Sequence, residues 1–352
     1  MEEISVIGID LAKRVFQLCA MTSSGTVVWE KRLRRGAFIN FLEGEAPRCL
    51  VGMEACGGAH HWARWLVARR FSVKLMTPIA VKAYRAGVHK NDQRDARAVA
   101  EATGRSQVAA VRVKSEAAQA TQALMRVRER RIRQRVQTAN QLRGLLNEFG
   151  IVLPKGPQLL LARACELMAT APFAALPAAV QELVQTLVDE VVEQAEKVKA
   201  VDAALMTAVQ ADANCRLLMS IPSIGPINAA GLAVALEAPR VFRRGRAFAA
   251  FLRLVPRQQA SAESSKLRGV GRQQACEMRR YLVLAAQTLL IRVNRIKEPS
   301  QDPLLAWAGR LLRRKTRNVA VVAVAAKLAR IAWAVMAKNQ PYTPRTLRAQ
   351  PV

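Results

Sequence analysis

Residues 4–10 read ISVIGID, a run of β-branched and apolar residues that ends at an acidic side chain. This composition is typical of a buried β-strand. A second strand is predicted over residues 15–21 and a third over residues 25–34, with the turn residues Ser23, Ser24 and Gly25 between them. The chain therefore opens with a predicted three-stranded meander.

Strand and helix signals alternate over the residues that follow the meander. Two more strands are predicted, at 49–53 and 73–76, and a last extended piece at 108–113. Helices are predicted to begin at Phe38 and to cover residues 59–70, 78–86 and 92–103. A meander followed by strands that are connected through helices is the pattern of an RNase H-like mixed sheet. We therefore expect an α/β domain over residues 1–113.

The middle of the chain, residues 114–211, has the pattern of long helices. Between 115 and 149, leucines and valines recur at spacings of three and four, with arginines between them. In a second helix, predicted over 178–209, apolar residues recur every seven positions, at Val184, Val191, Val198 and Leu205. This heptad pattern predicts a coiled-coil seam. Its partner is either the helix at 115–149 or a second copy of the chain.

The last predicted domain, residues 212–340, is mainly α-helical, and residues 341–352 form a loose tail. The domain opens with LLMSIPSIGP at 217–226, which fits a plain turn between helices or a helix-hairpin-helix whose amides hold a phosphate. The longest apolar stretch, 318–336, contains Lys327 and Arg330. Two cations at mid-bilayer are costly, so we predict a packed helix and no membrane partner.

The chain is strongly basic, with 55 Lys and Arg against 26 Asp and Glu and a formal net charge of +29. A surplus of this size favours a polyanionic partner, because each neutralised phosphate releases counterions. A ribosomal-type structural protein and a protein of acidic membrane surfaces are the alternatives. Six cysteines are scattered without CxxC pairs, which argues against a zinc ribbon and a disulfide framework and predicts a reduced, cytoplasmic compartment.

Four acidic residues stand where the predicted elements begin or end. Asp10 and Glu54 follow two strands, and Asp92 and Asp95 share one face at the start of a helix. If the two strands are neighbours, all four carboxylates meet at one edge of the sheet. Such a cluster repels itself unless a cation binds, and Mg²⁺ prefers oxygen ligands. Two such ions support phosphodiester displacement by holding the attacking and the leaving oxygen.

Each of these acids also has a simpler explanation. Asp92 or Asp95 is a good N-cap for its helix, Asp10 can serve as a turn former after its strand, and Glu54 can be a surface residue. The Gly8-Ile9-Asp10 sequence alone would also suit the phosphate loop of an actin-like ATPase. The four positions together favour the metal site.

Several segments resemble one family, the insertion-sequence-110 transposases, and within it the 1111 subgroup. They include GIDLAKRVFQL at 8–18, CLVGMEACGGAHHWAR at 49–64, HKNDQRDARAVAEA at 89–102 and SIPSIGPINAAGLAVAL at 220–236. The resemblance implies a RuvC-like domain whose DEDD tetrad falls on Asp10, Glu54, Asp92 and Asp95. It further implies a coiled-coil region and a C-terminal transposase domain. Members of the family are similar to recombinases that use a structured non-coding bridge RNA to pair donor and target DNA.

The resemblance also implies a serine nucleophile in the C-terminal domain, after a Pro-Arg-Gln stretch. Ser261 is the best match, and Ser264 and Ser265 are alternates. Ala262 stands where the family has glycine, and Glu263 adds a charge beside it. The other reading of Ser261 is a solvated serine in a polar, basic loop.

Basic residues cluster in three parts of the chain, and we expect them to contact nucleic-acid backbones without choosing sequence. The candidates are Arg126, Arg130, Arg133, Arg243, Arg244, Arg246, Arg257, Lys266, Arg268, Arg313, Arg314 and Lys315. Solvated helix faces are the simpler explanation.

The sequence thus predicts a DNA transposase that cleaves and rejoins strands with Mg²⁺ and a serine. Its expected partners are DNA, a bridge RNA and further copies of itself, and it is expected in the cytoplasm, at the nucleoid. A RuvC-like nuclease that uses water, and a catalytically decayed nucleic-acid-binding scaffold, are the alternatives.

Overall fold

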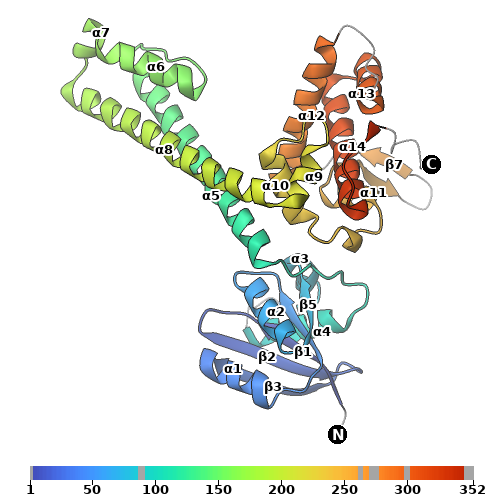
Figure 1. Ribbon diagram of the computed structural model, residues 1–352. Helices are drawn as coiled ribbons and strands as arrows, with labels where there is room; N and C mark the ends of the chain where they lie inside the picture. Colours follow the sequence, from blue (N-terminus) through green and yellow to red (C-terminus); the bar gives the residue numbers. More distant parts are fainter. Residues whose placement is uncertain (1–2, 86–91, 261–264, 269–276, 297–301, 345–352) are drawn as a thin grey trace. The chain divides into compact units, whose positions relative to one another are not determined.

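The strand run that opens the sequence forms the centre of the first of two structural units. The computed structural model describes residues 3–85, 92–260, 265–268, 277–296 and 302–344. The first unit is Met1–Ser115 and the second is Glu116–Val352 (Figure 1).

The first unit contains a five-stranded mixed sheet. Its strands are β1 Ile4–Asp10, β2 Val15–Thr22, β3 Val27–Arg34, β4 Leu50–Glu54 and β5 Ser72–Met76. Their order in the sheet is β3-β2-β1-β4-β5. The first three strands are antiparallel neighbours, and β4 and β5 continue the sheet in parallel with β1. The predicted meander with helix-connected strands is therefore confirmed, and the domain is consistent with an RNase H-like one.

Helices cover both faces of this sheet, because side chains alternate along each strand. The helices are α1 Arg35–Gly44, α2 Ala59–Ala68, α3 Pro78–Lys82 and α4 Asp92–Gly104. One face packs on α1 and α2 around Phe16, which stacks on Phe38 at 4.1 Å between ring centroids and meets the edge of Trp62. The other face packs on α4 through small residues. The sheet thus has a large aromatic core on one face and a closely packed helix on the other.

Two predicted elements of this unit are wrong in part. The helix predicted over 78–86 ends at Lys82, and residues 83–84 form a turn. The extended piece predicted at 108–113 is reduced to one bridge between Val111 and Leu75. The turn brings Arg85 to the end of the sheet, where the site lies.

The second unit begins with a helical hairpin. Its long arms are α5 Glu116–Asn147 and α8 Ala178–Ala211, and α6 Pro157–Met168 and α7 Ala171–Ala174 lie between them in the sequence. The arms are antiparallel and side by side (Figure 1). The predicted seam residues Val184, Val191, Val198 and Leu205 are all buried. Helix α5 of the same chain is therefore the partner against which this face of α8 packs.

The rest of the second unit is a helical domain with one β-hairpin. Its elements are α9 Ala213–Met219, α10 Pro226–Ala235, the short 3-10 helix η1 Pro239–Val241, α11 Gly245–Phe251, β6 Arg257–Ala260, β7 Ser265–Arg268, α12 Glu277–Arg295, α13 Pro303–Arg314 and α14 Arg317–Lys338. Within the described chain, α14 alone is long and apolar enough to cross a membrane, and 56% of its apolar window is buried inside the fold. It packs against α11 and α12, as the prediction of a packed helix requires.

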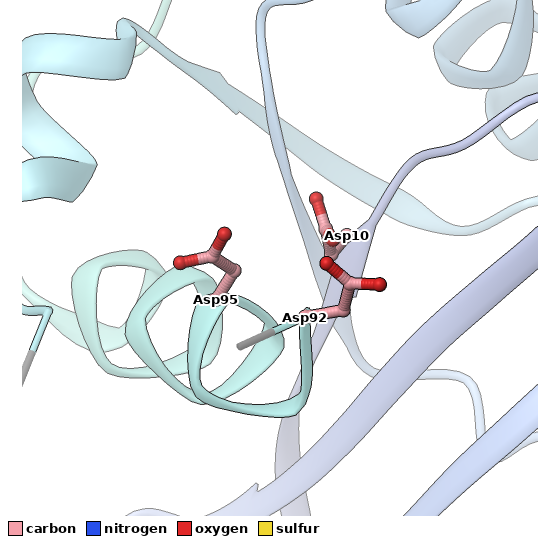
Figure 2. Close-up of side chains that lie close together, drawn as sticks. All are labelled: Asp10, Asp92 and Asp95. Carbon is pink, nitrogen blue, oxygen red and sulfur yellow. The ribbon is translucent and has the colours of Figure 1, made fainter. Parts of the chain in front are cut away.

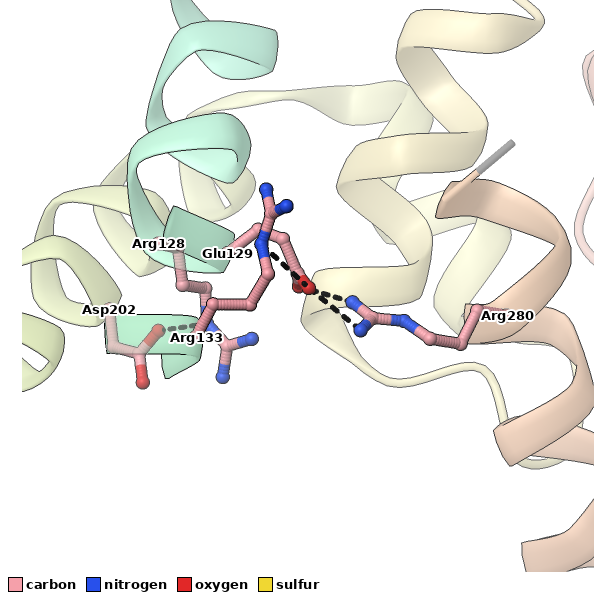
Figure 3. Close-up of polar contacts among 5 residues, drawn as sticks. All are labelled: Arg128, Glu129, Arg133, Asp202 and Arg280. Atoms are coloured by element: carbon pink, nitrogen blue, oxygen red, sulfur yellow. Dashed lines mark hydrogen bonds and ion pairs between the residues drawn. The ribbon is translucent and has the colours of Figure 1, made fainter. Parts of the chain in front are cut away.

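A buried acid connects the hairpin to this helical domain. Glu129 of α5 is 5% exposed and accepts hydrogen bonds from both terminal nitrogens of Arg280 on α12 (Figure 3). Arg133 lies 3.9 Å from the same carboxylate, and Arg128 pairs with Asp202 of α8. These ion pairs fix α5 against α8 on one side and α12 on the other.

Candidate metal centre

Three of the four predicted acids meet at the end of the central strand. Asp10 is the last residue of β1, and Asp92 and Asp95 lie in the first turn of α4. One carboxylate oxygen from each of the three lies within 4.8 Å of the others (Figure 2). Asp95 is 7% exposed, whereas Asp92 is exposed. The spacing of three residues in α4 thus puts both helix acids over the end of β1, as predicted.

Glu54 lies on the same edge of the sheet but is held by a different partner. It is the last residue of β4, the parallel neighbour of β1. It lines a cavity of about 340 Å³ together with Asp10, Asp92 and Asp95. Arg85 also lines this cavity, and its Nη2 lies 2.9 Å from Glu54 Oε2. The four predicted acids therefore share one cavity, with Glu54 engaged by a guanidinium.

Two glycines let α4 approach the sheet closely enough to form the cluster. Gly8 and Gly52 are paired across β1 and β4, and each stands two residues before its acid, on the same face. A Cβ atom at Gly8 would lie 2.2 Å from the backbone nitrogen of Ala100, and one at Gly52 would lie 1.6 Å from Thr103 Oγ1. The two Gly-x-acid triplets, Gly8-Ile9-Asp10 and Gly52-Met53-Glu54, are the sequence signal from which this packing could have been predicted.

A second set of contacts fixes the start of α4. Glu30 of β3 accepts hydrogen bonds from Arg97, one of them at 2.8 Å from Nη2, and from the Gln93 amide. These hydrogen bonds, of which the one from Arg97 has the largest effect, hold the pKa of Glu30 below its ordinary value. Gln93 lies between Asp92 and Asp95 in the sequence, so the contact with β3 orients the turn that carries both acids.

The surroundings of Asp10, at the end of β1, disfavour the charged form of its carboxyl group. The pKa of Asp10 is raised from an ordinary value of 3.8 to about 6, first by burial and then by the charges of Asp95, Asp92 and Glu54. The guanidinium of Arg85 acts in the opposite direction. Among the described residues, the charges that act on Asp10 are three carboxylates that raise its pKa and the Arg85 guanidinium that lowers it, and Arg32 also lines the cavity. An excess of carboxylates of this kind stabilises a divalent cation. The donor set consists of carboxylate oxygens alone, so it fits a hard cation such as Mg²⁺.

The predicted serine belongs to a segment with an unexpected hairpin. Strands β6 and β7 pair antiparallel, with Ala260 opposite Ser265. Ser261 and Ser264 lie outside the described residues, between the two strands. Ser265 is the first residue of β7. The sequences RQQA and SKLR contain no β-branched residue, which is why the strands were not predicted.

Most of the predicted nucleic-acid contacts lie on exposed surface. The exposed members are Arg126, Arg130, Arg133, Arg243, Arg244, Arg246, Arg313, Arg314 and Lys315. Arg257, Lys266 and Arg268 belong to the β-hairpin, where only the backbone is described. Arg133 has a structural role as well, through its ion pair with Glu129.

Comparison with known families agrees with this arrangement. Residues 7–151 match the model of DEDD transposases of the IS110 type, described as "Transposase". Residues 215–301 match the model described as "Transposase IS116/IS110/IS902 family". The first match contains all four acids of the cavity, and the second contains the β-hairpin.

Several curated relatives are similar over nearly their whole length. A Pseudomonas aeruginosa protein named "Probable family 20 transposase" is 37% identical over 97% of this chain and 99% of its own. The transposase for insertion sequence element IS1111A of Coxiella burnetii is 31% identical over 97% of this chain and 92% of its own. The transposase for element IS1328 of Yersinia enterocolitica is 33% identical over 97% of this chain and all of its own. With its acids at the end of an RNase H-like sheet and both family segments in order, this chain belongs to the IS110 family of transposases, enzymes that cleave and recombine DNA.

Proposed function

We propose that this transposase cleaves and rejoins DNA with a divalent metal held by Asp10, Glu54, Asp92 and Asp95 and with Ser261 as nucleophile. The observation that carries the metal half is the convergence of Asp10, Asp92 and Asp95 within 4.8 Å, in a cavity that Glu54 also lines. The serine half rests on the family resemblance, and Ser261 follows β6 directly in the sequence.

Two Mg²⁺ ions are the proposed occupants, and when bound they stabilise negative charge on the attacking and leaving oxygens of the phosphodiester. The acids have separate tasks in this arrangement. Asp10 and Glu54, fixed at the ends of paired strands, set the position of the site relative to the sheet. Asp92 is exposed, so it is the acid most open to an approaching substrate.

The proposed serine step conserves the phosphodiester energy. The Ser261 oxygen forms a bond to phosphorus as one bridging P–O bond of the DNA backbone breaks, and the departing oxygen takes up a proton. Reversal on a new DNA end breaks the serine ester and restores a DNA phosphodiester. No nucleotide cofactor is required, because the number of phosphate ester bonds stays constant.

A bridge RNA is the proposed source of sequence choice. The exposed arginines and lysines, including Arg243, Arg244 and Arg246, then hold RNA and DNA backbones without reading bases. We propose further that the protein works as a homo-oligomer, in the cytoplasm at the nucleoid.

The test is to incubate purified protein with DNA of its element ends and the flanking non-coding RNA, with and without Mg²⁺. We expect a covalent protein–DNA adduct that requires Mg²⁺ and disappears in Ser261→Ala and in Asp10→Asn. Ser264→Ala is the matched control and is expected to retain the adduct.

Other outcomes would identify the alternatives. Strand cleavage that persists in Ser261→Ala without any adduct would indicate a nuclease that uses water. Salt-sensitive RNA binding without cleavage of any substrate would indicate a scaffold. An adduct that persists in Ser261→Ala and is lost in Ser264→Ala or Ser265→Ala would move the nucleophile to that residue.

A further inference from the structure

Arg85 bridges two of the acids that we propose as metal ligands. Its Nη2 lies 2.9 Å from Glu54 Oε2, and its Nε lies 3.1 Å from Asp95 Oδ1. The two carboxylates come from different elements, β4 and α4. A single guanidinium thus joins the sheet side of the cavity to its helix side.

These contacts engage two carboxylates that we propose as metal ligands. Asp95 belongs to the cluster within 4.8 Å, and Glu54 is the fourth acid of the cavity. A guanidinium carries its charge at every physiological pH and presents its donors in a fixed plane, so it satisfies two carboxylates at once. A divalent ion beside it would meet both a positive charge and occupied ligand atoms. Arg85 and the metal therefore compete for the same acids.

Arg85 is also positioned so that its side chain can leave the carboxylates of Glu54 and Asp95. Its side chain is 34% exposed, whereas those of Glu54 and Asp95 are 20% and 10% exposed. It follows the turn at residues 83–84 and is not part of a helix or strand. The two carboxylates thus belong to a strand end and a helix, and Arg85 is the most exposed of the three paired side chains.

We propose that Arg85 exchanges partners: it neutralises Glu54 and Asp95 in the metal-free protein, leaves them when a divalent cation binds, and then binds a phosphate of the DNA. The inference rests on the proposed metal site. A guanidinium released from these carboxylates beside the proposed metal site is a strong bidentate ligand for a phosphate group. Metal binding and DNA binding are therefore coupled through one side chain.

The first measurement is Mn²⁺ affinity by isothermal titration at constant ionic strength, without DNA. In Arg85→Gln we expect Mn²⁺ to bind roughly tenfold more tightly than in the unchanged protein, because the competing charge is gone. The matched control is Lys82→Gln. It removes the same charge from the exposed end of α3, outside the residues that line the cavity, and should leave the affinity within about twofold.

The second measurement is the affinity for a short DNA duplex, with and without Ca²⁺, by fluorescence anisotropy. The unchanged protein and Lys82→Gln should bind the duplex more tightly with Ca²⁺, and Arg85→Gln should lose most of this increase. Arg85→Lys keeps the charge but cannot bridge two carboxylates in one plane. Its Mn²⁺ affinity should therefore lie between those of Arg85→Gln and the unchanged protein. The Arg85→Lys variant also tests the inference if Arg85→Gln fails to fold, which a circular dichroism melt would show.

The outcomes separate this inference from the proposed function. Equal Mn²⁺ affinity in Arg85→Gln and the unchanged protein, or equal tightening in Lys82→Gln, would overturn the role of Arg85 alone. Retention of the Ca²⁺-dependent increase in Arg85→Gln would overturn the phosphate contact. Failure of the unchanged protein to bind any Mn²⁺ would instead overturn the metal site itself.

Discussion

Gly8 of the central strand lies directly beneath Ala100 of α4, so closely that a Cβ atom at Gly8 would be 2.2 Å from the Ala100 backbone nitrogen. Neither backbone can move without moving the strand or the helix that carries the acids. The distance between Asp10 and the Asp92–Asp95 turn therefore depends on a contact between two residues that bear no functional group.

Gly8→Ala is expected to displace α4 and to weaken metal binding while all four acids remain. Overpacking of this kind costs about 1–3 kcal/mol of stability or more. Mn²⁺ titration and thermal melting would measure the two effects. Gly36→Ala is the control, since nothing lies within 4 Å of its Cβ position in α1, and it should be neutral or slightly stabilising. Unchanged Mn²⁺ affinity in a folded Gly8→Ala protein would contradict the prediction.

Metal affinity is expected to rise with pH through about 6, because the pKa of Asp10 is raised to that value and the proton competes with the metal. Stability of the metal-free protein has the opposite trend. A carboxyl pKa that is raised in the folded state stabilises the fold at low pH, and this contribution is lost as the pH rises from about 4 to 6. Asp10→Asn should remove both trends and stabilise the metal-free protein at pH 7 by about 1–2 kcal/mol after solvent screening. Melting curves at several pH values, with and without Mg²⁺, would show whether the trends are absent.

Glu129→Ala is expected to lower the free energy of unfolding by about 2–3 kcal/mol. The variant removes a carboxylate that is 5% exposed and leaves Arg280 without its acceptor, and the half-exposed position of Arg280 moderates the cost. The hydrogen bond from Arg280 lowers the pKa of Glu129, so the stabilisation is present above its ordinary value of 4.5 and is lost as the pH falls below it.

The control for Glu129 is Glu196→Ala. Glu196 pairs with Lys199 on the surface of α8, where the two side chains are 62% and 73% exposed. Such a pair contributes about 0.5 kcal/mol or less. Urea denaturation of both variants would test the difference, and equal losses would argue against a special role for the buried acid.

Neutralising Arg313, Arg314 and Lys315 together is expected to weaken nucleic-acid binding on every sequence by a similar factor. All three are exposed at the end of α13. Each phosphate contact contributes about 0.9 to the slope of log affinity against log salt, so the slope should fall by up to roughly 3. Binding titrations between low and moderate salt would measure it. An unchanged slope would mean that this cluster is only a solvated surface.

Much of the first unit could be predicted from local sequence patterns. The runs that end at Asp10 and Glu54 are strongly β-forming, and the start of α4 at Asp92 follows from its acids and its alanine-rich interior. The position of Asp10 next to Glu54 follows because parallel neighbours end at one edge of the sheet.

The features that could not be predicted depend on contacts between distant residues. Arg85 looks like any other base of a basic chain, and only the fold brings it to Glu54 and Asp95. Glu129 belongs to a helix rich in arginine. Its burial depends on α12, which carries its partner Arg280, 151 residues further along the chain. The β6–β7 hairpin is held by backbone pairing, with little help from side-chain propensity.

The close packing at Gly8 and Gly52 has a consequence for judging whether a related transposase can be active. In this fold, a chain with all four acids but a larger residue at either glycine is expected to hold α4 less closely against the sheet. Gly8 and Gly52 are therefore positions to inspect together with the four acids. Loss of activity can begin at residues that take no part in the chemistry.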